Sequence, residues 1–212
     1  MKKLTIFALI STVVTLNVWA APSDALINQY NQAAEGDEEA VQVVYQTLED
    51  AIAKEGADPL SLVYLGSTET LKGRDAFMPW NKMKYTEQGL ATIAKGLDLL
   101  QNDATPIHEQ QIRQGLPESL LAQAIAAATF TSLPDMFNHF ERGYDLYLDL
   151  LADEQFQHQH YDATSWIYLY AIRAALRAQE PQQANEWLKE MQQKNSQHPL
   201  TLQAQAIIEQ AA

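Results

Sequence analysis

Two stretches between Asp58 and Asn102 constrain the fold most, because together they predict two antiparallel helices joined by a short connection. Apolar and small residues recur in both arms at the three-to-four spacing of a buried helix stripe. The stripe residues are Leu62, Leu65 and Gly66 in the first arm, and Gly89, Ile93, Gly96 and Leu97 in the second. The connection, residues 74–82, is rich in charged and aromatic side chains. We therefore expect a helical hairpin around which the rest of the chain packs.

The N-terminus has the three-part pattern of a secretory signal peptide. Two basic residues, Lys2 and Lys3, precede a mostly apolar run over residues 4–18, which is short for a membrane span and interrupted by polar residues. Val18 and Ala20 fit the two positions that a signal peptidase reads, so we expect cleavage after Ala20. The alternative is an uncleaved N-terminal anchor. The expected organisation is a signal peptide over residues 1–20 and one domain over residues 21–212, in a periplasmic or secreted protein.

The chain is acidic, with 27 Asp and Glu against 14 Lys and Arg and a net charge of −13. Loss of Lys2 and Lys3 with the signal peptide would leave 12 basic residues and a net charge of −15. Such a charge repels phosphate groups and anionic lipid, which argues against a nucleic acid or a membrane surface as the partner. The sequence has no Cys, which excludes disulfides and a lipoprotein anchor.

Downstream of Pro22, composition and periodicity predict an all-α fold without strands, because β-branched runs are short and apolar residues recur at helical spacing. Capping residues and breaks place helices at about residues 24–35, 38–55, 60–72, 80–100, 118–132, 137–151, 163–178, 181–191 and 200–211. Residues 104–117 are expected to form a connection with one helical turn, and residues 153–162 a polar break. The helix at 118–132 is apolar on nearly every side, so we expect it at the centre.

Four of the expected helices share a spacing in which a small residue precedes a large one by one turn. The pairs are Ala40 and Val44, Gly89 and Ile93, Gly143 and Tyr147, and Ala184 and Leu188. In helix-pair repeats, the small residue lets two helices approach closely, and the large one fills the gap toward the next pair. The intervals between the small residues are irregular, so any repeats are degenerate.

This spacing resembles the second helix of tetratricopeptide (TPR) repeats, and the stretch Leu62 to Gly66 resembles part of their first helix. The segment from Glu180 to Met191 is the best single match, although the repeat interval of the family is about 34 residues and the intervals here are longer. The resemblance implies a right-handed helical-repeat (TPR-like) solenoid of about four degenerate helix pairs plus a C-terminal capping helix.

The hairpin has a narrower resemblance. Gly66-Ser67, followed by the motif Arg-Asp-Ala-x-x-Pro-x-x-Lys at residues 74–82, is similar to a group of exported bacterial TPR-like proteins with no assigned activity. This resemblance covers roughly residues 58–150. It implies a helical solenoid and says little about a biochemical role.

No motif indicates catalysis or a bound metal or cofactor. His108-Glu109 begins like the zinc-protease signature but lacks the second His one helical turn later. His158, His160 and Asp162 could offer three metal ligands, yet such spacing also arises by chance in a Gln-rich linker. The carboxylates are spread along helix faces, and no nucleophile or phosphate-binding motif occurs. We therefore expect a protein that is not an enzyme and has no catalytic residue, metal or cofactor.

Arg74, Asp75 and Trp80 allow two interpretations. In the structural one, Asp75 caps or braces the following helix, Arg74 pairs with it or bonds helix-end carbonyls, and Trp80 fills the core. In the functional one, Arg74, Lys82 and Lys84 place positive charge at the rim of a ligand groove on an otherwise acidic protein.

The aromatic residues Tyr161, Trp166, Tyr168 and Tyr170 occupy more than one face of their expected helix, so they cannot all enter one core. Some are expected to be exposed as anchors of an interface, or to pack on the final helix. The sequence leaves open which of them do so.

Resemblance to TPR proteins implies a concave face, lined by the first helix of each pair, that accepts a peptide or protein segment. Carried over from Leu65-Gly66, the groove side of the third helix would show Val63, Ser67 and Thr70. When the residues around the hairpin connection are added to these three, the expected partner-binding residues are Val63, Ser67, Thr70, Arg74, Trp80, Lys82 and Lys84. The alternative is a small-molecule carrier with an enclosed apolar pocket lined by Trp80, Phe137 and Tyr144.

Overall fold

The computed structural model describes residues 21–102 and 105–211, most of which are helical. The α-helices are α1 (Asp24–Glu35), α2 (Glu38–Glu55), α3 (Pro59–Asp75), α4 (Pro79–Asn102), α5 (Glu118–Ser132), α6 (Phe140–Ala152), α7 (Glu154–Gln157), α8 (Tyr161–Arg177), α9 (Pro181–Asn195) and α10 (Pro199–Ala211). Two 3-10 turns, η1 (Ile107–Glu109) and η2 (Asp135–Phe137), precede α5 and α6. The all-α prediction is confirmed for these residues, whereas the expected signal peptide, residues 1–20, lies outside them. None of the described helices is both long and apolar enough to span a membrane.

Side-chain caps set the start of the first three helices. Ser23, Asp37 and Asp58 each accept hydrogen bonds of 2.9–3.3 Å from backbone N–H groups in the first turn of α1, α2 and α3. α1 ends at Gly36, whose φ of 116° is readily adopted only by glycine. These boundaries match the predicted ones.

α3 and α4 form the expected hairpin, and glycines allow them to cross at very short range. A Cβ on Gly66 would lie 2.5 Å from the carbonyl oxygen of Gly89 and 2.7 Å from the backbone nitrogen of Ile93. A Cβ on Gly96 would likewise lie 2.9 Å from the carbonyl oxygen of Pro59. The small residues of the hairpin therefore permit close helix approach, as their spacing predicts.

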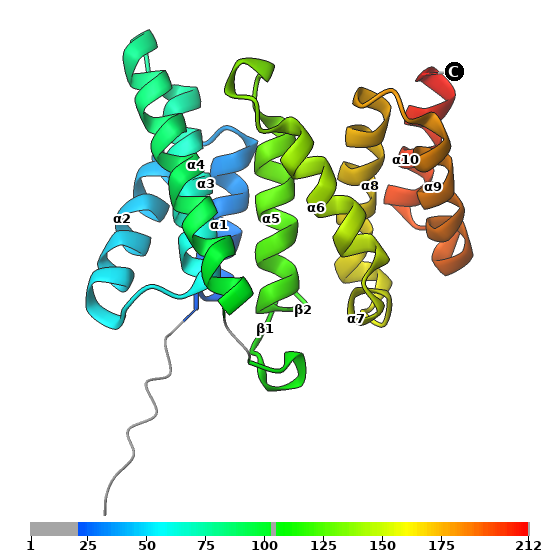
Figure 1. The fold of residues 1–212 in the computed structure, drawn as a ribbon, viewed down its shortest axis with the longest axis horizontal. Coiled ribbons are helices and arrows are strands. Elements are labelled where there is room, and N and C mark those ends of the chain that lie inside the picture. Colours follow the sequence, from blue (N-terminus) through cyan, green and yellow to red (C-terminus); the bar gives the residue numbers. More distant parts are fainter. Residues whose placement is uncertain (1–20, 103–104, 212) are drawn as a thin grey trace, which may run out of the picture.

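The helices pack mainly against their neighbours along the chain (Figure 1). α1 packs on α2, α2 on α3 and α3 on α4, while α5 packs on α3 and α6, and α8 packs on α9. α5 lies in the middle of this row, where Leu120, Leu121 and Phe130 are fully buried. The predicted central position of α5 is confirmed.

The connection before α5 contains a small β-hairpin, so the expectation of a chain without strands is wrong here. β1 (Ile112–Arg113) pairs antiparallel with β2 (Leu116–Pro117). Gln114 and Gly115 join them with φ values of 51° and 79°, as a type I′ turn requires. The Asp24 carboxylate accepts the N–H of Gln114 at 2.9 Å and so ties the turn to α1. Strands of two residues are too short to show an alternating pattern in the sequence.

A short helix, α7, occupies the predicted polar break. The Asp153 carboxylate accepts the N–H of Gln155 at 2.7 Å and caps this helix. Phe156 is 1% exposed, and its ring centroid lies 5.7 Å from that of Tyr168 in α8. One buried aromatic residue thus holds a helix of four residues, which is too short for helical periodicity to be visible in the sequence.

The aromatic residues of α8 divide among three environments, as their spread over several faces indicates. Tyr168 is fully buried, and the hydroxyls of Tyr161 and Thr201 in α10 lie 2.6 Å apart. Tyr170 is 39% exposed and packs edge-on against Trp166. α10 packs on both α8 and α9 and covers them at the C-terminal end of the row.

Candidate functional site

A partly open cavity of about 1120 Å³ lies along the row of helices, and we call it the groove. Its lining comes mainly from α1, α3, α5 and α8, with the start of α4 and the η2 connection at its edge. The lining residues of the three helices with the most regular faces are Ile27, Tyr30, Asn31, Ala34 and Glu35 of α1, Leu121, Ile125, Ala128, Thr129 and Ser132 of α5, and Asp162, Ala163, Trp166 and Tyr170 of α8. These residues recur every three or four positions, so each helix presents one face to the groove.

Aromatic and thioether side chains form one wall of the groove. The ring centroids of Trp166 and Tyr170 lie 6.0 Å apart in an edge-on arrangement, and the Arg173 guanidinium lies 5.4 Å from the Tyr170 ring. Phe137 and Met136 also line the groove, and Met136 is 70% exposed. This wall offers apolar surface with few competing hydrogen-bond groups, which suits the side chains of a bound segment.

Polar groups at the floor of the groove are satisfied by one another. Ser67 of α3 and Thr129 of α5 have their hydroxyl oxygens 2.8 Å apart, and the Thr129 hydroxyl donates to the Ile125 carbonyl. Burial raises the pKa of Tyr30, while hydrogen bonds with Ser67 and Thr129 oppose the rise. The Tyr30 ring also packs edge-on against Tyr64, at 4.9 Å between centroids. These contacts hold α1, α3 and α5 together beneath the groove.

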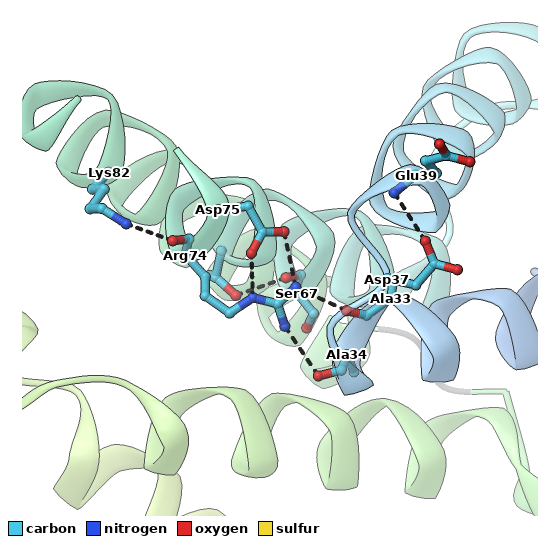
Figure 2. Close-up of polar contacts among 9 residues, drawn as sticks. Ala33, Ala34, Asp37, Glu39, Ser67, Arg74, Asp75 and Lys82 are labelled. Carbon is cyan, nitrogen blue, oxygen red and sulfur yellow. Dashed lines mark hydrogen bonds and ion pairs between the residues drawn. The ribbon is translucent and has the colours of Figure 1, made fainter. Parts of the chain in front are cut away.

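Arg74 lies at one end of the groove and connects the C-terminal ends of α1 and α3 (Figure 2). Its guanidinium donates to the carbonyl oxygens of Ala33 and Ala34, at 3.0 and 3.1 Å, and makes a two-point contact with the Asp75 carboxylate, at 2.6 and 2.9 Å. Hydrogen bonding to Asp75 raises the pKa of Arg74. The Lys82 ammonium donates to the Arg74 carbonyl oxygen at 2.6 Å. The arrangement expected for a structural Arg74 is therefore present.

Three of the expected partner-binding residues, Thr70, Arg74 and Lys82, line the groove. The Thr70 hydroxyl donates to the Ser67 carbonyl oxygen at 2.7 Å, and the polar groups of Arg74 and Lys82 are engaged in the contacts just described. Positive charge at the rim is thus present, but it already holds α1, α3 and α4 together.

The other four expected residues lie elsewhere. Val63 is fully buried and Ser67 is buried beneath the groove, because α3 is packed against α1, α2, α4 and α5. Trp80 is 66% exposed and does not fill the core, since the start of α4 projects beyond its neighbours. Lys84 is exposed and does not line the groove. The Asp75 carboxylate bonds Arg74, and among the described residues it forms no hydrogen bond with the start of α4.

The residues expected for an enclosed carrier pocket are not gathered in one place. Phe137 lines the groove, whereas Trp80 does not. Tyr144 is 6% exposed, and its hydroxyl donates to the Glu180 carboxylate at 2.7 Å between α6 and the start of α9. The expected lining of the pocket is therefore wrong for Trp80 and Tyr144.

Sequence reasoning missed the contribution of α1 to the groove. Asn31, Ala34 and Glu35 are exposed and line it, together with Gln114 of the β-hairpin turn. Their spacing of three and four marks a second face of α1, next to its buried stripe. The sequence shows this face, but only the packing shows that it borders a cavity.

His158, His160 and Asp162 do not form a metal site in the structure. The described residues contain no group of three His, Cys, Asp or Glu side chains that could hold a metal ion. The His158 ring nitrogen Nδ1 lies 2.6 Å from the Glu154 carbonyl oxygen, and Asp162 lies 3.8 Å from His198. The side chains of His158 and Asp162 therefore have other partners.

A buried carboxylate, Glu69, lies outside the groove where α3 meets α4. Glu69 is 2% exposed and accepts hydrogen bonds from the Gln88 amide and, at 2.6 Å, from the Thr92 hydroxyl. Burial raises the pKa of Glu69, and these two hydrogen bonds oppose the rise. Lys72 lies nearby, over the Tyr45 ring at 3.3 Å from its centroid, and burial lowers the pKa of this lysine.

Glu69 is expected to make the folded protein relatively more stable as the pH falls from 7 toward 5. Because the pKa of Glu69 is higher in the folded than in the unfolded state, the folded state takes up the proton first. Glu69→Gln has no titrating group at this position. The free energy of unfolding of the variant minus that of wild type should therefore be largest at pH 7 and should decrease as the pH is lowered. Urea denaturation at a series of pH values measures this difference. Glu87→Gln, an exposed site on α4, controls for loss of one charge. A difference that grows on acidification would contradict the prediction.

Comparison with family models, with curated proteins and with solved structures finds no match to this chain.

Proposed function

We propose that this protein is a TPR-like, non-enzymatic binding protein whose groove accepts an extended segment of a peptide or protein. The proposal is supported by the order of the helices: α1 with α2, α3 with α4, α5 with α6, and α8 with α9 pack as successive pairs, and α10 follows them. The groove is lined mainly by the first helix of each pair, which is the concave face of such an architecture. This placement is the observation on which the proposal rests.

The partly open shape of the groove favours a chain segment over a compact metabolite. Small-molecule pockets usually enclose about 300–1000 Å³, whereas the groove has a volume of about 1120 Å³ and is partly open. The satisfied hydrogen bonds of Ser67 and Thr129 fix its floor, so little rearrangement is needed on binding. Met83, Met136 and Tyr170 are exposed large apolar side chains of the groove that a partner would cover.

A small-molecule carrier is the second candidate, and the apolar character of the lining favours it. Trp166, Phe137 and Leu121 line the same volume and could enclose an apolar ligand. Native mass spectrometry of the purified protein separates the two functions. If the wild-type protein carries a small molecule that a groove variant does not, the result supports the carrier. If no small molecule is bound and peptides bind in the groove, the result supports the peptide-binding protein.

Peptides selected from a phage-displayed random library are expected to bind in the groove. Tyr170→Ala should weaken the binding of such peptides at least tenfold, because it removes an aromatic contact. Ala34→Trp should abolish binding by filling the groove from α1. Leu202→Ala, which truncates an exposed apolar side chain of α10 outside the groove, should leave binding unchanged. Isothermal titration with folded variants gives the affinities, and equal binding by all three variants would contradict the proposal.

The proposed export to the periplasm or the cell exterior rests on the pattern of residues 1–20, which lie outside the described residues. N-terminal sequencing of protein recovered from a periplasmic fraction tests it. A mature chain that starts at Ala21 would support export and cleavage.

A further inference from the structure

The turn between α3 and α4 exposes a cluster of large apolar side chains. Phe77 is 89% exposed and Trp80 is 66% exposed, and Met78 and Met83 also show more than a third of their surface. We call residues 76–84 the hairpin tip. Figure 1 shows this turn reaching beyond the ends of the neighbouring helices at the upper left. Contiguous exposed apolar side chains of this kind mark an interaction site.

The hairpin tip is basic, although the chain as a whole is acidic. Residues 76–84 contain Lys82 and Lys84 and no Asp or Glu, so they carry a charge of +2 against −13 for the whole chain. Among the described residues, neither lysine forms an ion pair within 4.0 Å. Charges in solution are screened over about 8 Å at physiological ionic strength. The first contact of a projecting tip with a surface therefore depends mainly on the charge of the tip itself. The repulsion of anionic lipid expected from the acidic chain as a whole is screened at this point.

Three backbone N–H groups of the hairpin tip are paired within the turn. The Ala76 N–H donates to the Lys72 carbonyl oxygen at 3.0 Å, and the N–H groups of Asn81 and Lys82 both donate to the Met78 carbonyl oxygen, at 2.9 and 3.0 Å. Unpaired backbone groups are costly in an apolar environment. These three donors therefore need no new partner when the tip enters a less polar medium.

We propose that the hairpin tip docks on an anionic lipid surface, with Phe77 and Trp80 in the interfacial layer and Lys84 facing the lipid phosphates. Lys82 keeps its hydrogen bond to the Arg74 carbonyl oxygen and adds its positive charge beside Lys84. Trp side chains favour the bilayer interface, and lysines next to a membrane are attracted to anionic lipids. A stable protein interface needs about 800 Å² on each partner, whereas Phe77, Met78, Trp80 and Met83 together expose roughly 500 Å². A lipid surface needs no matching shape, so it fits a small convex tip better. Pro79, Lys82 and Met83 of the tip also form one edge of the groove, so the contact lies directly beside the groove.

Trp80 fluorescence tests this contact directly. Wild-type protein is titrated with vesicles of phosphatidylcholine and phosphatidylglycerol, or of phosphatidylcholine alone, and every variant is prepared with the same N-terminus. We expect a blue shift of the emission with the anionic vesicles and at least fivefold weaker association with the zwitterionic ones. Trp80→Phe should retain binding in a sedimentation assay but lose most of the shift, which assigns the signal to Trp80.

Variants separate the two parts of the contact. The double variant Phe77→Ser, Trp80→Ser should lose binding to anionic vesicles while keeping its helical circular dichroism, because both side chains are exposed. Lys84→Gln should reduce the preference for anionic vesicles without removing apolar surface. Ile112→Ser, an exposed apolar site in the β-hairpin at the other end of the molecule, should bind like wild type.

Two outcomes would overturn the proposal. One is vesicle binding that is equally strong in wild type, in the double variant and in Lys84→Gln. The other is a Trp80 blue shift that grows with protein concentration and does not need vesicles, which would assign the tip to contact with a second copy of the chain.

Discussion

Gly66→Ala is expected to lower the free energy of unfolding by about 3 kcal/mol or more, since the added methyl group enters an overpacked site. The new Cβ would lie 2.5 Å from the Gly89 carbonyl oxygen and 2.7 Å from the Ile93 nitrogen. Both are backbone atoms within helices, so neither can move without displacing α4 relative to α3. Chemical denaturation followed by circular dichroism gives the change.

The sign of this effect distinguishes packing from helix propensity. In an unconstrained helix, Gly→Ala stabilises by about 1 kcal/mol because alanine restricts the unfolded chain. The matched control is Ala91→Gly on the exposed face of α4, which should destabilise by about 1 kcal/mol through propensity alone. If Gly66→Ala were neutral or stabilising, the close approach of α3 and α4 at Gly66 and Gly89 would be refuted.

Several helix boundaries were predictable because they depend on local signals, whereas α6 starts three residues later and α9 ends four residues later than expected. The predicted range 118–132 is the observed α5, since Pro117 precedes its start and Leu133-Pro134 follows its end. Asp58 caps α3 through the Ser61 N–H, as an Asp before Pro at the first helical position favours. Two short features gave no periodic pattern in the sequence. They are α7, which packs through the single residue Phe156, and the turn at Gln114-Gly115.

The site was less predictable because it depends on how far each helix reaches and on how many neighbours surround it. α4 has 24 residues and α1 has 12, which corresponds to lengths of roughly 36 and 18 Å. Trp80, in the first turn of the longer helix, therefore has no neighbour to bury it. Val63 was assigned to the groove from a TPR pattern, but α3 has helices packed on several sides and only part of it reaches the groove.

Arg74→Ala is expected to lower the free energy of unfolding by about 2 kcal/mol, because the change removes hydrogen bonds made by a charged group between α3 and α1. The guanidinium bonds the carbonyls of Ala33 and Ala34 and holds the Asp75 carboxylate on its other side. Its side chain is 38% exposed, so water can replace part of what is lost. Hydrogen exchange should increase most in α1, whose C-terminal end loses its attachment to α3.

Arg74→Lys separates geometry from charge in the same position. Lysine keeps the positive charge, but its single ammonium cannot hold both carbonyls and the carboxylate in the planar arrangement of the guanidinium. We therefore expect it to recover less than half of the stability lost in Arg74→Ala. If Arg74→Lys were as stable as wild type, a positive charge at this position would be enough to hold α1 against α3. The guanidinium geometry would then not be needed for stability, and Arg74 could contact a ligand at the edge of the groove. If Arg74→Lys is unstable but still binds selected peptides once folded, Arg74 acts on the groove only by fixing α1 against α3.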